Sequence, residues 1–258
     1  MENLTVIKVG GKVVEDENSL QKLLADFNAI KGLKVLIHGG GNIATALADK
    51  MGLQVEMVNG RRVTSAEMLN IVVMVYGGLV NKKVVAGLQA LGCNALGLTG
   101  ADLNIIRAVK RPVKEVDYGF VGDVISVNTD ALAKLLSHGF IPVIAPLTHD
   151  LNGQMLNTNA DDITNAVAKA LSRHFQVKLV FCFDKKGVLK NVNDEKSLIS
   201  KITKDEFINL ANKQVINAGM IPKLENGFAS LESGVKQVFI TDVNGIGKEN
   251  PGGTELVK

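Results

Sequence analysis

The chain has 258 residues, of which 46% are hydrophobic and 21% charged, the composition of a globular protein of one or two domains. Its net charge of +3 is too small to indicate nucleic acid or a membrane surface as a partner. The two cysteines lie far apart, no signal pattern starts the chain, and the longest apolar run, residues 71–80, is shorter than the roughly 20 residues of a membrane span. These features exclude a disulfide scaffold and predict a cytoplasmic protein.

Strand-like and helix-like stretches alternate along the chain. β-rich runs predict strands at residues 4–9 and 33–41, and between them apolar residues recur at helical spacing, with Ser19 as the N-cap. A long helix should start at an N-cap of Thr64 or Ser65 and run to about Leu91. Further helices are expected at residues 42–51, 129–139, 160–172, 204–219 and 222–234, and further strands at 94–99, 140–147, 177–184, 235–241 and 253–257.

Residues 104–127 differ from the rest, because they combine β-rich stretches with glycines and Pro112 and have little helical period. They predict a β-hairpin insertion. Elsewhere, strands separated by helices predict an α/β fold with a mostly parallel sheet covered on both faces. A weak boundary near Arg173 and His174, between the predicted helix 160–172 and the predicted strand 177–184, suggests that the chain forms two lobes on one continuous sheet.

The first two predicted strands both run into glycines, Gly10 and Gly11 after the first and residues 39–41 after the second. In open α/β sheets ligands bind beyond the carboxyl ends of the strands. Glycines before a helix direct several N–H groups and the helix dipole to one spot, which predicts an anion site, most simply for phosphate. The glycines could instead only permit tight turns, and His38 could either line the site or be structural.

A dinucleotide site is the main competing interpretation of these glycines. Gly39, Gly41 and Ala44 fit the spacing G-x-G-x-x-G/A, but the acidic residue expected about 20 positions later has only Glu56 as a candidate. This oxidoreductase hypothesis also leaves Lys8, inside the first apolar strand, without a role. The sequence contains no P-loop, protein-kinase, G-x-S-x-G or H-E-x-x-H pattern.

The chain resembles the amino acid kinase family in stretches that follow one another over nearly its whole length. They are IKVGGKVV, VLIHGGGN, NGRRVT, GLTGADLNIIRA, DYGFVGDV, LNTNADDITNAVAKAL, GMIPKL and GTELV. Single motifs are shared across the family, which includes carbamate kinase, aspartokinase and uridylate kinase. NGRRVT together with NTNAD and GMIPK narrows the resemblance to the acylglutamate branch.

The resemblance implies a three-layer αβα sandwich with a mostly parallel central sheet. It implies an N-lobe, residues 1–174, for acylglutamate binding and dimerisation, and a C-lobe, residues 175–258, for ATP. The implied reaction moves the γ-phosphoryl group of ATP to the γ-carboxylate of N-acetyl-L-glutamate, or of a related N-acylglutamate, in arginine biosynthesis. Mg²⁺ would be held mainly by ATP, with no metal ligands from the protein. The resemblance also implies that arginine-inhibited members carry an extra N-terminal helix that links dimers into hexamers. Because this chain begins at its first strand, a homodimer insensitive to arginine is expected.

Roles carry over to matching residues of this sequence. Lys8 and Lys223 match the lysines that stabilise the transition state, and Asp161 matches the aspartate that orients them. The matching substrate-binding residues are Gly40, Gly41, Arg62, Asn157 and Asn159. The matching ATP-binding residues are Gly10, Gly11, Asp184, Lys185, Lys186, Gly187, Val188, Leu189, Val215, Ile216 and Asn217.

The residues suit this chemistry on physical grounds. A carboxylate nucleophile is already ionised at neutral pH, since its pKa is about 4.3, so no general base is needed. The obstacle is repulsion between anions, about 4 kcal/mol for unit charges 4 Å apart at an effective dielectric of 20, which fixed lysines and N–H groups offset. The planar fork of Arg62 suits a carboxylate, and Arg61 could add charge beside it. Taken singly, Asp161 could simply favour its helix dipole and Asn159 could simply cap that helix.

Two other hypotheses remain open at this point. The chain could be another family member acting on carbamate or a nucleotide, or a non-catalytic ligand sensor of the same fold. A sensor should have lost Lys8, Asp161 or Lys223, and all three are present.

Overall fold

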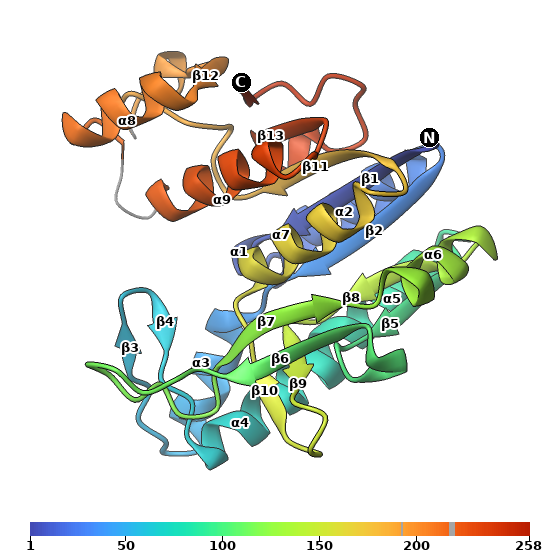
Figure 1. Cartoon of the computed structure of the whole chain (residues 1–258), viewed down its shortest axis with the longest axis vertical. Coiled ribbons are helices and arrows are strands. Elements are labelled where there is room, and N and C mark those ends of the chain that lie inside the picture. The colour runs from blue at the N-terminus through green and yellow to red at the C-terminus, as the bar shows by residue number, and fades with distance from the viewer. Residues whose placement is uncertain (192, 217–219) are drawn as a thin grey trace.

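The computed structural model describes residues 1–191, 193–216 and 220–258. Its centre is an eight-stranded sheet in the order β12-β14-β13-β11-β1-β2-β8-β5 (Figure 1). The strands are β1 (Asn3–Val9), β2 (Leu33–His38), β5 (Ala95–Leu98), β8 (Ile141–Ile144), β11 (Gln176–Cys182), β12 (Lys201–Thr203), β13 (Gln237–Thr241) and β14 (Thr254–Val257). Neighbouring strands in this sheet pair in parallel except β13 and β14, which confirms the mostly parallel sheet.

Helices cover both faces of the sheet, which confirms the αβα sandwich (Figure 1). One core cluster packs one face against α1 (Gly11–Glu15), α2 (Glu17–Ala29), α3 (Gly41–Lys50), α4 (Ala66–Val72) and α5 (Asn81–Ala90). The other packs the opposite face against α6 (Thr129–Ser137), α7 (Ala160–Leu171), α8 (Lys204–Asn212) and α9 (Ile221–Glu232). Alternate residues of β1 enter the two clusters, as the period of a strand buried on both faces requires.

Strand β1 is the middle of the molecule. It pairs with β2 on one side and β11 on the other, so that Lys8 lies opposite Ile37 and Phe181. Because all three strands are parallel, their carboxyl ends meet at one edge of the sheet. The chain before residue 175 supplies β1, β2, β5 and β8, and the chain after it supplies β11 to β14, so both halves share one continuous sheet.

The long predicted helix is confirmed, with an irregular middle. Ser65 is its N-cap and accepts a hydrogen bond from the Met68 amide, and a π-helical segment, Val73–Val80, separates α4 from α5. By length and composition alone, the 25-residue helical stretch Ala66–Ala90 is long and apolar enough to cross a bilayer. The apolar run at residues 71–80 did not indicate this, because it is shorter than a membrane span. In the structure, 44% of the most apolar window of Ala66–Ala90 is buried against the rest of the protein.

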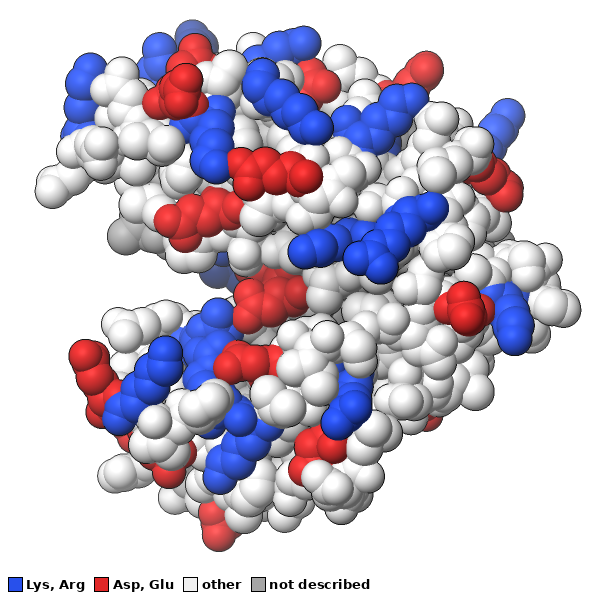
Figure 2. Space-filling model, in the orientation of Figure 1, with Lys and Arg blue, Asp and Glu red and all other residues white. Residues whose placement is uncertain are grey.

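The predicted hairpin insertion is confirmed as β6 (Ile106–Lys110) and β7 (Gly122–Val127), which pair antiparallel. It belongs to a four-stranded sheet, β10-β9-β6-β7, with β9 (Leu147–His149) and β10 (Met155–Asn157). This sheet and the ribbon of β3 (Met57–Val58) and β4 (Arg61–Arg62) lie in the lower part of Figure 1. In the view of Figure 2 the surface is hollowed between this part and the part that carries α8 and α9.

Two local predictions are corrected, and one strand was missed. The N-cap of α2 is Asp16, whose carboxylate accepts a hydrogen bond from the Ser19 amide, because the short α1 brings the chain into α2 three residues earlier. Helix 204–219 is too long, since α8 ends at Asn212 and Gln214 has a left-handed φ of 55°. Strand β12 was not predicted, because it is only three residues long.

Candidate active site

The two glycine junctions face each other across neighbouring strand ends. A Cβ on Gly39 would lie 3.0 Å from the Gly11 nitrogen, and a Cβ on Gly11 would lie 3.5 and 3.6 Å from the nitrogens of Gly40 and Gly41. Backbone nitrogens of both junctions therefore converge at the N-terminus of α3, where side chains would fill the space between them. This is the geometry of an anion site.

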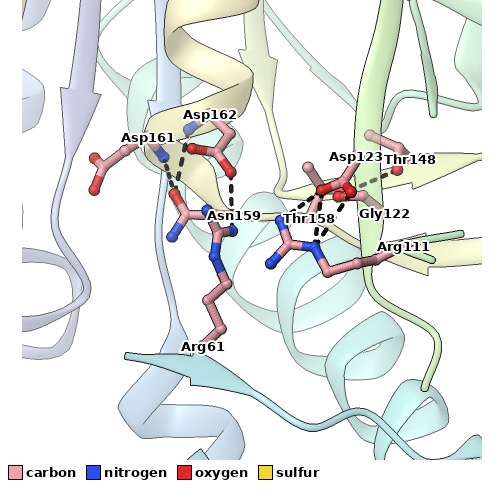
Figure 3. Close-up of polar contacts among 9 residues, drawn as sticks. All are labelled: Arg61, Arg111, Gly122, Asp123, Thr148, Thr158, Asn159, Asp161 and Asp162. Carbon is pink, nitrogen blue, oxygen red and sulfur yellow. Dashed lines mark hydrogen bonds and ion pairs between the residues drawn. The ribbon is translucent and has the colours of Figure 1, made fainter. Parts of the chain in front are cut away.

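Lys8 projects beside these junctions from β1 and is only 7% exposed. Its ammonium group lies 2.8 Å from the Asp161 carboxylate, in the first turn of α7. Asn159 is the N-cap of α7, because its side-chain oxygen accepts hydrogen bonds from the amides of Asp161 and Asp162 at 2.7 and 3.2 Å (Figure 3). The cap fixes the first turn of α7, and with it the carboxylate that meets Lys8.

Lys223 reaches the same place from the first turn of α9. The ring of Phe183 lies 4.6 Å from the Lys8 ammonium and 4.5 Å from the Lys223 ammonium, measured to the ring centroid. Burial lowers the pKa of Lys223, the Asp161 charge opposes that shift, and the Lys8 charge adds to it. The structure thus brings together the residues predicted to be catalytic, from β1, α7 and α9.

A cavity of about 190 Å³ opens beside the second glycine junction. Among the residues that line it are all those predicted to bind the substrate: Gly40, Gly41, Arg62, Asn157 and Asn159. Val121, Pro146 and Tyr76 add apolar walls.

Arg62 is a buried charged residue in the wall of this cavity and is 8% exposed. Its Nη2 donates to the Gly41 carbonyl and to the Thr45 hydroxyl, both at 2.8 Å. Its Nη1 is buried and has no hydrogen-bond partner among the described residues. Burial raises the pKa of the neighbouring Tyr76, an effect that the Arg62 charge opposes. A buried guanidinium with an unused donor fits a ligand carboxylate.

Other polar residues hold the walls of the cavity. Asn157 donates to the Thr64 hydroxyl at 2.9 Å, and Arg61 makes an ion pair with Asp162 at 2.9 Å. Figure 3 shows Arg61 approaching the start of α7 from the β3–β4 ribbon. Arg61 lines the cavity, but its charge is already paired.

Six of the predicted ATP-binding residues line a second cavity, of about 500 Å³. Its walls include Lys185, Gly187, Val188, Leu189, Val215 and Ile216. Asp184 makes an ion pair with Lys12 at 2.8 Å, which lowers the pKa of the Asp184 carboxyl. Gly10, Gly11, Asp184 and the exposed Lys186 do not line this cavity, and Asn217 lies outside the described residues.

His38 proves to be structural. It is fully buried, with Nδ1 2.8 Å from the Gly39 carbonyl and Nε2 3.2 Å from the Asn81 amide nitrogen. These partners assign a neutral ring that donates through Nδ1 and accepts through Nε2. Burial lowers the pKa of His38 to about 4.

Sequence reasoning missed Phe183, Thr45 and Tyr76. None of them belongs to a recognisable sequence motif. Each contacts residues of the site because segments that are separate in the chain pack together. No cluster of three or more His, Cys, Asp or Glu side chains that could hold a metal ion occurs among residues 1–191, 193–216 and 220–258.

A family model described as the amino acid kinase family matches residues 3–242. The chain belongs to the amino acid kinase family. This kinase is 60% identical over 246 residues to the acetylglutamate kinase of Parabacteroides distasonis, a match that covers 95% of this chain and 96% of that protein. It is 61% identical over 251 residues to the acetylglutamate kinase of Bacteroides thetaiotaomicron, with 97% of each chain covered.

Solved structures agree on the fold of this kinase. A protein called smu.665 from Streptococcus mutans matches with a TM-score of 0.79 and 30% identity, covering 98% of each chain. Carbamate kinase from Giardia lamblia bound to AMP-PNP matches with a TM-score of 0.74, covering 100% of this chain and 99% of that one. At 15% identity the second likeness shows the fold alone.

The burial of His38 predicts a pH dependence of stability. Its pKa is about 4 in the folded chain, against 6.5 for the unperturbed side chain, so the unfolded state binds the proton first as the pH falls. The stabilisation is complete above pH 6.5 and should decrease by about 3 kcal/mol between pH 7 and pH 4. Urea unfolding at a series of pH values measures this.

His38→Gln should remove that part of the pH dependence, and exposed His174→Gln should retain it. Identical pH profiles for the unfolding free energy of the wild type and His38→Gln would contradict the assignment.

Proposed function

We propose that this kinase transfers the γ-phosphoryl group of ATP to the γ-carboxylate of N-acetyl-L-glutamate, or of a related N-acylglutamate, in arginine biosynthesis. The observation that carries the proposal is the unused, buried Nη1 of Arg62 in a cavity that opens beside the converging glycine nitrogens. The identity of about 60% to proteins named acetylglutamate kinase supports the substrate.

Arg62 binds the α-carboxylate of the substrate in this proposal. Its Nη2 is held by Gly41 and Thr45, so the guanidinium is already oriented when the substrate arrives. Asn157 and Asn159, which also line the cavity, contact the acylamino group in this proposal. The γ-carboxylate then lies toward the backbone nitrogens of Gly40 and Gly41.

The reaction needs no proton transfer. A γ-carboxylate oxygen forms a bond to the γ-phosphorus of ATP, the bond from that phosphorus to the bridging oxygen breaks, and ADP leaves with the electron pair. Lys8 and Lys223 stabilise the charge on the transferring group from two sides, and the glycine N–H groups add dipoles that need no rearrangement. Asp161 holds the Lys8 ammonium group in place.

ATP binds in the second cavity, between the segments that contain Gly187 and Val215. Lys185 lines this cavity and suits phosphate oxygens, whereas Lys186 does not line it. Mg²⁺ is held mainly by ATP oxygens in this proposal.

The two halves of the chain divide these tasks. Residues 1–174 contribute the walls of the Arg62 cavity, and residues 175–258 contribute the walls of the ATP cavity. We also propose a cytoplasmic homodimer. Exposed Met74 and Leu79, 51% and 57% exposed on the long helix, offer an apolar surface to a second copy.

The proposed reaction predicts an acyl phosphate product. Mg-ATP with N-acetyl-L-glutamate and hydroxylamine should give a hydroxamate and an equal amount of ADP, and N-succinyl-L-glutamate should be tested in parallel to settle the acyl group. Lys8→Met should lower kcat by several orders of magnitude, because a fixed charge is lost at the transferring group. Absence of hydroxamate with every acylglutamate would exclude the proposal, and turnover with carbamate or a nucleotide would favour another family reaction.

The role given to Arg62 makes a separate prediction. Arg62→Lys keeps the charge but loses the planar fork, so KM for the acylglutamate should rise about 10- to 100-fold, on the order of 1.4 to 2.8 kcal/mol, while KM for ATP stays within about twofold. Steady-state kinetics with each substrate varied in turn measures both constants. Equal increases in the two KM values would contradict the assignment.

A further inference from the structure

Phe183 is the one aromatic side chain that both predicted catalytic lysines contact among the described residues. It follows the last residue of β11 and is 8% exposed. Lys8 comes from β1 and Lys223 from α9, so the ring lies where three separate elements meet. Phe183 lines neither the Arg62 cavity nor the ATP cavity.

The ring is held firmly in its position. It stacks on Phe181 with a centroid separation of 6.2 Å and an interplanar angle of 3°. Its Cδ1 lies 3.4 Å from where a Cβ on Gly10 would be, so the glycine junction leaves room for the ring. A ring packed in this way has little freedom to move away from the ammonium groups beside it.

An aromatic face attracts cations, and the attraction grows when the cation is desolvated. Lys8 is buried and Lys223 is partly buried, and each one repels the other's charge, as the effect of Lys8 on the pKa of Lys223 indicates. A negative ring face close to both ammonium groups counters this repulsion without adding a carboxylate that would repel phosphate. An aliphatic side chain of similar size would fill the space but would not attract either cation.

We propose that Phe183 is a positioning residue that holds the ammonium groups of Lys8 and Lys223 in place for phosphoryl transfer. The proposal rests on the proposed function for its kinetic consequence, and on the described contacts for its geometry. Phe183 acts through the lysines and not by touching either substrate. Its loss should therefore change kcat and leave substrate binding nearly unchanged.

The test compares Phe183→Leu, which removes the ring but keeps apolar bulk, with Phe183→Tyr, which keeps the ring. We expect kcat of Phe183→Leu to fall about 5- to 30-fold, with both KM values within about twofold of the wild type. Phe183→Tyr should keep kcat within about twofold. Thermal melting of each variant checks that it is folded.

Phe239→Leu is the matched control. Phe239 is a buried phenylalanine on β13 whose ring lies 5.3 Å from the Lys178 ammonium, and neither residue lines the Arg62 or the ATP cavity. This variant should lose stability without loss of kcat. The proposal is overturned if Phe183→Leu keeps the wild-type kcat, if both Leu variants lower kcat alike, or if Phe183→Tyr falls as far as Phe183→Leu.

A second measurement does not depend on activity. In protein carrying ¹³C-labelled lysine, the ring should shift the Cε-proton signals of Lys8 and Lys223, and Phe183→Leu should abolish both shifts while Phe183→Tyr retains them. If the wild type transfers no phosphoryl group but the shifts are present, the proposed function fails and the positioning geometry stands. If the shifts are absent from the wild type, the positioning role itself fails.

Discussion

The buried ion pair between Lys8 and Asp161 is the interaction on which the rest of the site depends. Their side chains are 8% and 16% exposed, and their charged atoms lie 2.8 Å apart. A lone cation in the central strand of a sheet would be costly, and pairing with a carboxylate offsets that cost. The pair also joins β1 to the first turn of α7, which Asn159 caps. Charge as well as apolar packing therefore sets how this helix lies on the sheet.

Other positive and N–H groups lie around that pair. They come from elements that the parallel sheet brings together at one edge. Gly11 and Gly40 supply backbone nitrogens from adjacent strand ends, and α9 brings Lys223 from the other half of the chain. The eight-stranded sheet runs without a break from the half with the Arg62 cavity to the half with the cavity proposed for ATP. This arrangement suits the proposed reaction, in which two anions must approach each other, because fixed cations and N–H dipoles offset their repulsion.

Much of this was predictable from the sequence, for physical reasons that can be named. Apolar periodicity gave the central strands and the helices, and parallel strands ending in glycines predicted that those glycines would converge. The contacts of Phe183 with two lysines were not predictable, because they depend on how β11, β1 and α9 pack. The same holds for Thr45 and Tyr76 beside Arg62, which no local pattern marks. Strand β12 was not predicted, because a three-residue strand has too few positions to show an apolar period.

A double-mutant cycle in urea unfolding at neutral pH tests the central ion pair most directly. Removing one partner of a buried pair leaves an uncompensated charge and typically costs about 3–5 kcal/mol. The account predicts that Asp161→Asn destabilises the wild-type chain by about that amount and the Lys8→Met chain by much less, because the charge that needed Asp161 is gone. Equal losses in the two backgrounds would contradict it, since the carboxylate would then act independently of Lys8.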